Sequence, residues 1–210
     1  MVVNNYQKGI LPHARLIPLC IDLDFYKYNR SRYTVDPVVN MSVNRIEGKK
    51  GVIETAQSCS DLGYRFLLVG RVSDGKYMER VKKIAGKFLD FRNGVSDDAV
   101  KAAYYESAIH VCNSQDFFES GTLPLLESMA CGLPVLTRRV GHVPELYDGT
   151  NMHINDGHNE DVETLKGHIK KMMDSRDYRI QLRLRGEETV KPRSDTWRAE
   201  PYKNLYLEFA

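Results

Sequence analysis

The chain has 210 residues, 42% of them hydrophobic and 28% charged, which suits one globular domain with a sizeable core. Its 30 Lys and Arg against 28 Asp and Glu give a net charge of +2, so we expect no nucleic-acid partner. The four cysteines lack the short spacing of a zinc or redox site, and no apolar run could span a bilayer, so we expect a cytoplasmic protein with reduced, buried thiols.

Along the chain, short apolar runs alternate with stretches of helical spacing. We expect strands at 38–43, 66–69, 88–91, 109–112, 134–137 and 152–154, and helices at 52–59, 77–86, 96–104, 124–131, 162–173, 178–190 and 197–209. Ser96 is a good N-cap, and Pro192 should end the helix before it. This alternation predicts an α/β fold: a single Rossmann-like, doubly wound parallel sheet with helices on both faces.

The most informative stretch, residues 113–145, places two glutamates on either side of a helix start. Glu119 lies in the loop after the strand at 109–112, and Glu127 lies one turn inside the helix that Pro124 opens. Both carboxylates can therefore lie near one rim, spaced to bind hydroxyl groups.

Between these glutamates, Gly121, Thr122 and Leu123 form the turn into the helix. The free amides at Thr122 and Leu123, at the positive end of the helix, would attract a phosphate. Hydroxyl-binding carboxylates beside a phosphate site suit a nucleotide sugar.

The same stretch contains Leu-Pro-Leu-Leu-Glu-Ser-Met-Ala-Cys-Gly-Leu-Pro-Val, which resembles the signature of the group 1, or family 4, glycosyltransferases, retaining enzymes of the GT-B fold. That family pairs two glutamates with seven residues between them, as Glu119 and Glu127 are paired here. The resemblance implies that Glu119 binds the donor sugar and orients it, and that Glu127 binds the ribose. A first-turn glutamate favoured by the helix dipole is the competing interpretation of Glu127.

Upstream, Arg45 and Lys50 follow the strand at 38–43 at the separation that the family shows. The resemblance implies that these cations hold the donor diphosphate, so Glu119, Arg45 and Lys50 are the catalytic candidates. Arg92 and Val95 stand where the family contacts the base, with ordinary turns as the competing interpretation.

Two positions depart from the family pattern. Ser120-Gly121-Thr122 replaces a common Gly-Phe-Gly, and Asn44 replaces the glycine before the arginine. We expect the first change to alter the shape of the donor pocket, and the second to affect how closely the diphosphate can approach the backbone.

The resemblance covers about residues 15–210, which correspond to the second domain of a two-domain enzyme. It implies a linker-like segment at 1–24 from a missing N-terminal domain, a donor-binding domain at 25–194, and a C-terminal helix at 195–210 that packs back toward the domain junction. The acceptor domain would then lie in cis or in trans, and it could bring the protein to a membrane surface.

The expected activity is transfer of a sugar from a UDP-, GDP- or ADP-linked donor to an acceptor, with retention and without a metal or cofactor. The isolated domain should be inactive. Two alternatives stay open: a nucleotide-sugar binding module or regulatory subunit, and a nucleotide-sugar epimerase of GT-B-like fold.

Other polar and aromatic groups receive structural interpretations. His110, His142 and His153 have no metal-ligand spacing, so we expect each to be hydrogen-bonded or exposed. The aromatic side chains near the signature should form core and pocket wall rather than a base-stacking platform; they are Tyr104, Tyr105, Phe117 and Phe118.

Overall fold

The computed structural model describes residues 2–29, 36–115, 119–158, 160–194, 200, 203–204 and 206–207. The helix expected at 197–209 falls mostly outside these residues. Phe117 and Phe118 also lie outside them.

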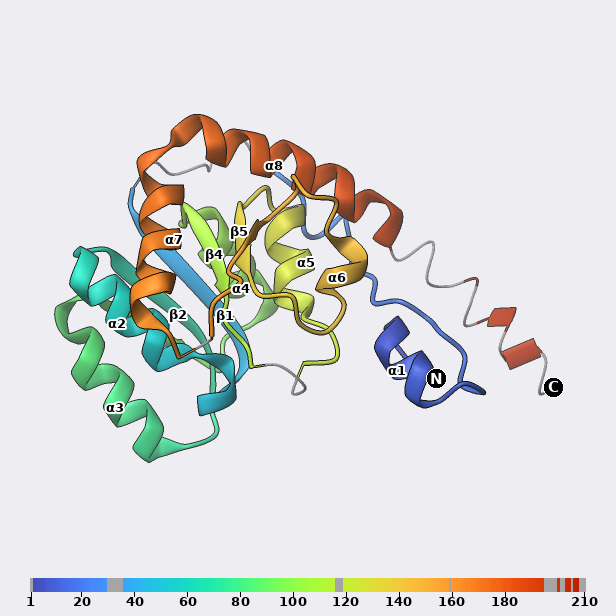
Figure 1. Ribbon diagram of the computed structural model, residues 1–210, viewed down its shortest axis with the longest axis horizontal. Coiled ribbons are helices and arrows are strands. Elements are labelled where there is room, and N and C mark those ends of the chain that lie inside the picture. The colour runs from blue at the N-terminus through green and yellow to red at the C-terminus, as the bar shows by residue number, and fades with distance from the viewer. Residues whose placement is uncertain are drawn as a thin grey trace.

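Within the described residues, one sheet of six parallel strands has the order β3-β2-β1-β4-β5-β6 (Figure 1). The strands are β1 (Val38–Ile46), β2 (Arg65–Val72), β3 (Leu89–Asn93), β4 (Ile109–Cys112), β5 (Val135–Thr137) and β6 (His153–Ile154). Every pairing in the sheet is parallel. The predicted doubly wound parallel sheet is therefore confirmed.

Eight α-helices connect and flank these strands in the described part of the chain. They are α1 (Asn5–Ile10), α2 (Val52–Leu62), α3 (Gly75–Ala85), α4 (Asp97–Tyr105), α5 (Leu123–Ala130), α6 (Val143–Leu146), α7 (Val162–Asp174) and α8 (Arg176–Val190). As expected, Ser96 caps α4 by accepting from the amide of Ala99, and α8 ends at Val190, two residues before Pro192. Neither α1 nor α6 was predicted.

The two faces of the sheet pack against different helices because successive side chains of a strand point in opposite directions. In β2, Phe66 and Leu68 pack into the core beneath α2, α3 and α7. Leu67 and Val69 pack on the opposite face with Ala103 of α4. Figure 1 shows α2, α3 and α7 gathered on one side of the sheet. Helices therefore cover both faces, as predicted.

The N-terminal segment lies outside these layers, where Figure 1 shows α1 beside α6. The backbone amide of Asn5 donates to the Glu145 carboxylate in α6, and the Asn4 side chain donates to the backbone carbonyl of Ser120. Farther along, Ile21 forms a parallel bridge with Ser194. The segment is thus fixed close to the loop that carries Glu119.

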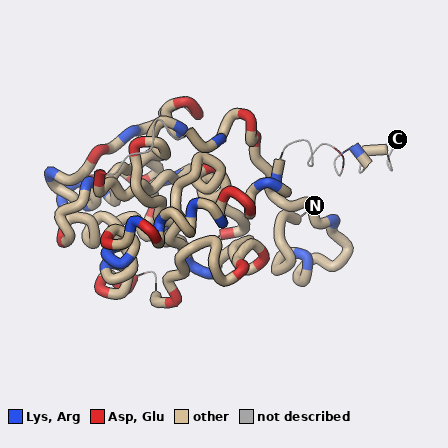
Figure 2. Tube along the Cα trace, turned by 90° about the horizontal axis from the view of Figure 1, so that it is seen from above, with Lys and Arg blue, Asp and Glu red and all other residues tan. Residues whose placement is uncertain are grey.

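All four cysteines are buried thiols outside any disulfide, as predicted. None of the described helices is both long enough and apolar enough to cross a bilayer. Figure 2 shows basic and acidic residues interspersed along the coloured part of the trace, consistent with the near-neutral charge balance.

Candidate functional site

The chain winds away in opposite directions from β1 and its neighbour β4, which makes the boundary between them the switch point of the sheet. Doubly wound folds bind ligands there, beyond the carboxyl ends of the strands. A cavity of about 780 Å³ opens at this edge. Six residues predicted from the sequence line it: Arg45, Lys50, Val95, Glu119, Gly121 and Glu127. Of the other three predicted residues, Thr122 and Leu123 line a smaller adjoining cavity of about 170 Å³ that shares Lys50, Glu119 and Gly121, and Arg92 lines neither cavity.

Lys50 is placed at this edge by the turn that opens α2. Gly51, with φ +66, ends the short 3-10 turn Gly48–Lys50, and a Cβ on Gly51 would lie 2.4 Å from the carbonyl oxygen of Asn113 at the end of β4. Only glycine accepts both the left-handed backbone and this close approach. The turn therefore places Lys50 next to the loop that follows β4.

Lys50 and Glu119 form an ion pair inside the cavity. Their Nζ and Oε2 atoms are 2.6 Å apart, and the two side chains are only 18% and 8% exposed. The hydroxyl of Ser114 donates to the same Oε2 at 3.1 Å. Because charge-assisted hydrogen bonds of this length are strong, these contacts hold Glu119 in one orientation.

The start of α5 faces the same cavities. Thr122 is its N-cap residue, but its side chain makes no capping hydrogen bond, and Pro124 has no amide proton. Among the described residues, the first-turn amides, including that of Leu123, therefore lack a side-chain cap at the positive end of the helix. Such a helix start favours an anion.

Gly121 lies beneath this helix start in a tightly packed loop. A Cβ on Gly121 would lie 2.5 Å from Leu19 Cδ1 and 3.0 Å from His142 Nδ1. Gly141, with φ +58, lies against the backbone of Glu119 and Ser120. The glycines thus let three segments meet behind the Lys50–Glu119 pair.

Glu127 reaches the cavity from inside α5 and accepts a hydrogen bond from the Tyr104 hydroxyl at 2.8 Å. Burial raises the pKa of Glu127, the hydrogen bond from Tyr104 opposes that rise, and the charge of Asp97 adds to it. Tyr104 is 1% exposed and lines the cavity, as expected of a core and wall residue.

Arg45 lies at the open rim. It follows an irregularity in the pairing of β1 with β2 between Ser42 and Arg45, and its side chain is 68% exposed. Its guanidinium is 3.7 Å from Glu47, a surface pair that contributes little. Arg45 can therefore turn toward an anion at small cost.

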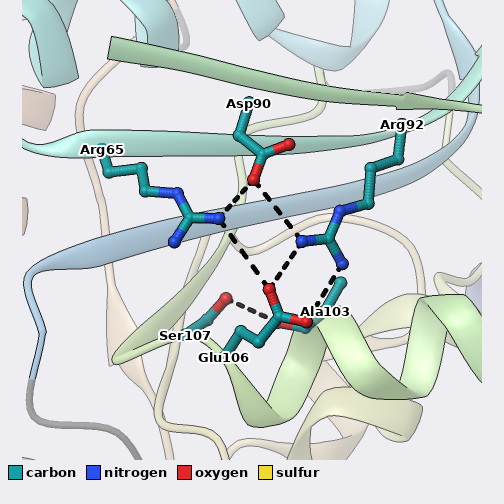
Figure 3. Close-up of polar contacts among 6 residues, drawn as sticks. All are labelled: Arg65, Asp90, Arg92, Ala103, Glu106 and Ser107. Carbon is teal, nitrogen blue, oxygen red and sulfur yellow. Dashed lines mark hydrogen bonds and ion pairs between the residues drawn. The ribbon is translucent and has the colours of Figure 1, made fainter.

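Arg92 is engaged elsewhere. Its Nη2 lies 2.6 Å from Glu106 Oε2 and 3.4 Å from Asp90 Oδ2, and Arg65 pairs with the same two carboxylates. Figure 3 shows these four side chains in one closed network between β2, β3 and α4. Of the two predicted base-contacting residues, Val95 lines the cavity and Arg92 does not.

The three histidines considered in the sequence analysis differ in their hydrogen bonding. His110 contacts Asn40 Oδ1 at 2.7 Å, and His153 contacts Tyr178 at 2.7 Å, so both are hydrogen-bonded as predicted. The prediction is wrong for His142, which is 1% exposed and has no hydrogen-bond partner on either ring nitrogen among the described residues. Burial, with the charge of Arg193, lowers the pKa of His142 to about 4.

Sequence reasoning also missed the side chains that hold the two glutamates. Ser114 follows β4 directly and could have been proposed as a loop donor. Tyr104 gave no signal, because its pairing with Glu127 depends on the packing of α4 against α5.

The fold and the site define a Rossmann-like α/β domain with an anion-suited cavity at its switch point. The sequence model of the family described as glycosyl transferases group 1 matches residues 29–189, and the chain belongs to that family.

Relatives show how much of a longer protein this chain represents. A probable sucrose-phosphate synthase of Thermosipho melanesiensis is 27% identical over 186 residues, which cover 81% of this chain and 42% of that protein. The chain thus spans less than half the length of this curated relative.

Solved structures share the fold at low identity. The sucrose-phosphate synthase of Thermosynechococcus elongatus superposes with a TM-score of 0.84 at 20% identity, over 99% of this chain and 57% of that one. Anabaena HepE, solved with UDP and glucose, has a TM-score of 0.77 at 16% identity, over 98% of this chain and 62% of that one.

Proposed function

We propose that this chain is the nucleotide-sugar donor domain of a retaining glycosyltransferase, which transfers a sugar from a nucleoside-diphosphate donor to an acceptor. One observation carries the proposal: the cavity at the switch point brings together Lys50, Glu119, Glu127 and the uncapped start of α5. A cation and helix amides suit a diphosphate, and flanking carboxylates suit hydroxyl groups on either side of it.

The diphosphate would lie between Lys50, Arg45 and the amides of Thr122 and Leu123. When the bond between the anomeric carbon and the β-phosphate oxygen breaks, negative charge develops on that phosphate. These cations and amides would stabilise it, since preorganised donors act most strongly where charge develops. On this proposal the transfer needs no metal ion.

Glu127 would accept hydrogen bonds from the ribose, and Glu119 would bind and orient the sugar. Neither is proposed as a nucleophile. Each carboxylate would be engaged with hydroxyl groups of the donor, which leaves it poorly placed to attack the anomeric carbon.

UDP is the first nucleotide to test, because a structural neighbour was solved with UDP and glucose; GDP and ADP remain candidates. The acceptor would bind a further domain, in cis or in trans, with residues 1–24 as the linker. The isolated chain should then bind donor without transferring it. We expect it to act in the cytoplasm.

A binding module without transfer activity is the second candidate. The same contacts in the cavity would hold a nucleotide sugar that is never transferred. Addition of an acceptor domain separates the two candidates, because only a transferase domain gains activity.

The proposal is tested by calorimetric titration of the chain with UDP, GDP, ADP and their sugar conjugates, without added metal. Saturable binding of one nucleotide should weaken by about 10-fold or more in Lys50→Ala, since a charge-assisted contact is lost. The neighbouring exposed Lys49→Ala is the matched control and should bind as wild type. Binding that is unchanged in Lys50→Ala and Glu127→Ala, or no binding at all, would overturn the assignment.

A further inference from the structure

The hydrogen bond between Tyr104 and Glu127 joins the proposed nucleotide site to the interior of the domain. Tyr104 comes from the last turns of α4, and its phenol is 1% exposed. Its hydroxyl donates to Glu127 Oε2 at 2.8 Å, whereas Oε1 accepts no hydrogen bond from the described residues. One carboxylate oxygen is thus fixed from behind, and the other faces the cavity that Glu127 lines.

The phenol itself is held by two aromatic rings from other elements. The His110 ring, in β4, meets it edge-on with centroids 5.7 Å apart, and the Tyr26 ring lies 6.4 Å away at 61°. Edge-to-face pairs of this kind favour one orientation. The Tyr104 hydroxyl therefore stays in place whether or not a ligand is bound.

The ring beneath Tyr104 belongs to a buried polar cluster. His110 Nδ1 lies 2.7 Å from Asn40 Oδ1, which also accepts from the Ser42 hydroxyl at 3.1 Å, and His110 Nε2 lies 3.1 Å from Cys112 Sγ. Burial lowers the pKa of His110 to about 3, so this support is uncharged at neutral pH. It fixes geometry without competing for the charge of Glu127.

Tyr104 also remains a donor. Burial raises the pKa of its hydroxyl well above the usual range, and the charge of Glu127 raises it further. The other groups near Glu127 are the Tyr26 hydroxyl, the Cys131 thiol and the carboxylate of Asp97. None of these three is cationic, so Tyr104 supplies the hydrogen bond that opposes protonation of Glu127.

We propose that Tyr104 is a positioning residue for nucleotide recognition: its hydroxyl holds the Glu127 carboxylate ionised and aimed at the ribose hydroxyls. This inference rests on the proposed function. A glutamate fixed before the ligand arrives loses less rotamer freedom on binding, which raises affinity without a new contact to the ligand.

The test is Tyr104→Phe, which removes one oxygen and keeps the packed ring. At neutral pH it should weaken binding of the nucleoside diphosphate about 5- to 20-fold. This is less than the roughly 12- to 150-fold expected for loss of a direct hydrogen bond to a charged group, because Tyr104 acts only through Glu127. The neighbouring Tyr105→Phe is the matched control, because its hydroxyl contacts the Lys27 carbonyl instead, and it should bind as wild type.

Three readouts separate positioning from general damage to the fold. The loss should shrink for a 2′-deoxynucleoside diphosphate, which lacks a hydroxyl for Glu127. The affinity of Tyr104→Phe should fall at a higher pH than that of wild type as the pH is lowered, because the lost hydrogen bond had lowered the pKa of Glu127. The double variant Tyr104→Phe with Glu127→Ala should bind no more weakly than Glu127→Ala alone.

The inference fails if wild type binds the nucleotide and Glu127→Ala weakens it, but Tyr104→Phe binds like wild type. It also fails if Tyr104→Phe loses ribose and deoxyribose ligands equally. If wild type binds no nucleotide, the proposed function itself is overturned.

Discussion

Replacement of Glu119 by Gln should tighten binding of the bare nucleoside diphosphate. Lys50 Nζ lies 2.6 Å from Glu119 Oε2, and both side chains are largely buried. A diphosphate must take Lys50 away from this pair. Glu119 is then left with the Ser114 hydroxyl in a position where only 8% of its side chain is exposed. A sugar-bearing donor brings hydroxyl groups that replace the lost contact, whereas the bare nucleotide does not.

The size of the effect follows from the interaction that is lost. Lys50 keeps its charge in the Gln variant, so a charge-assisted hydrogen bond remains and only the attraction between two opposite charges is lost. For a largely buried pair that loss is about 1–1.5 kcal/mol, by which the variant releases Lys50 more easily. That difference corresponds to roughly 5- to 12-fold tighter binding of the bare nucleotide. The sugar-bearing donor should gain less or lose affinity, because the neutral amide is a weaker acceptor for sugar hydroxyls.

The assay is calorimetric titration of wild type and Glu119→Gln with the nucleoside diphosphate and with its sugar conjugate. Glu163→Gln is the matched control: it removes the same charge from a Lys–Glu pair, with Lys166 at 2.5 Å, but on α7 and with Glu163 78% exposed. The control should leave both affinities unchanged. Bare-nucleotide binding by Glu119→Gln that equals or falls below that of wild type would refute the reasoning.

Three further predictions concern residues around the site. Arg92→Ala should lower the free energy of unfolding by about 1 kcal/mol, because it breaks a partly exposed ion network, and it should leave nucleotide affinity unchanged. Denaturant titration and calorimetry check this, and a loss of affinity would support Arg92 as a base contact. Gly51→Ala should destabilise the fold by more than Gly63→Ala and should weaken nucleotide binding. Both glycines have positive φ, but only a Cβ on Gly51 would meet the Asn113 carbonyl. Equal unfolding midpoints for the two variants would contradict the close-approach argument. His142→Leu should reduce the loss of stability at acid pH. As the pH falls below about 6.5 the unfolded state binds a proton at His142, whereas the folded pKa of about 4 delays protonation in the native state. In wild type the unfolding free energy should therefore fall by up to about 1.4 kcal/mol per pH unit in this range. Unfolding curves measured between these pH values check it, and an unchanged slope would exclude His142 as a source of the acid sensitivity.

The sheet could be predicted from the sequence because its strands are continuous apolar runs, such as Phe66 to Val69, bounded by turn residues. The ends of the strands were harder to predict. β1 continues to Ile46 because Arg45 still pairs with Arg71 after the irregularity, although Asn44 and Arg45 are polar and exposed. Pairing with a neighbouring strand decides such ends, and the local sequence does not contain it.

The candidate site likewise has residues that could be predicted and contacts that could not. Glu119, Glu127 and Lys50 could be placed at one edge because each follows a strand or opens a helix there. Their partners could not be predicted: Lys50 and Glu119 are 69 positions apart, and Tyr104 meets Glu127 only through helix packing. These contacts are set by sheet order and helix packing.

Arg92 shows most clearly which contacts the local sequence cannot predict. Its position near the end of β3 suggested a ligand contact, but it lies within the strand, paired in register with Val69. Its guanidinium meets Glu106, which follows α4 and is 14 positions away, so the ion network forms only after that helix packs on the sheet.

A crystal structure of this chain with the nucleoside diphosphate that it binds best tests the central claim most directly. The account predicts that the diphosphate lies between Lys50 and the amides at Thr122 and Leu123, that Lys50 has left Glu119, and that the ribose lies on Glu127. A nucleotide bound instead in the separate cavity of about 580 Å³ lined by Arg139 and Arg185 would contradict it. So would a bound nucleotide that leaves the Lys50–Glu119 pair intact.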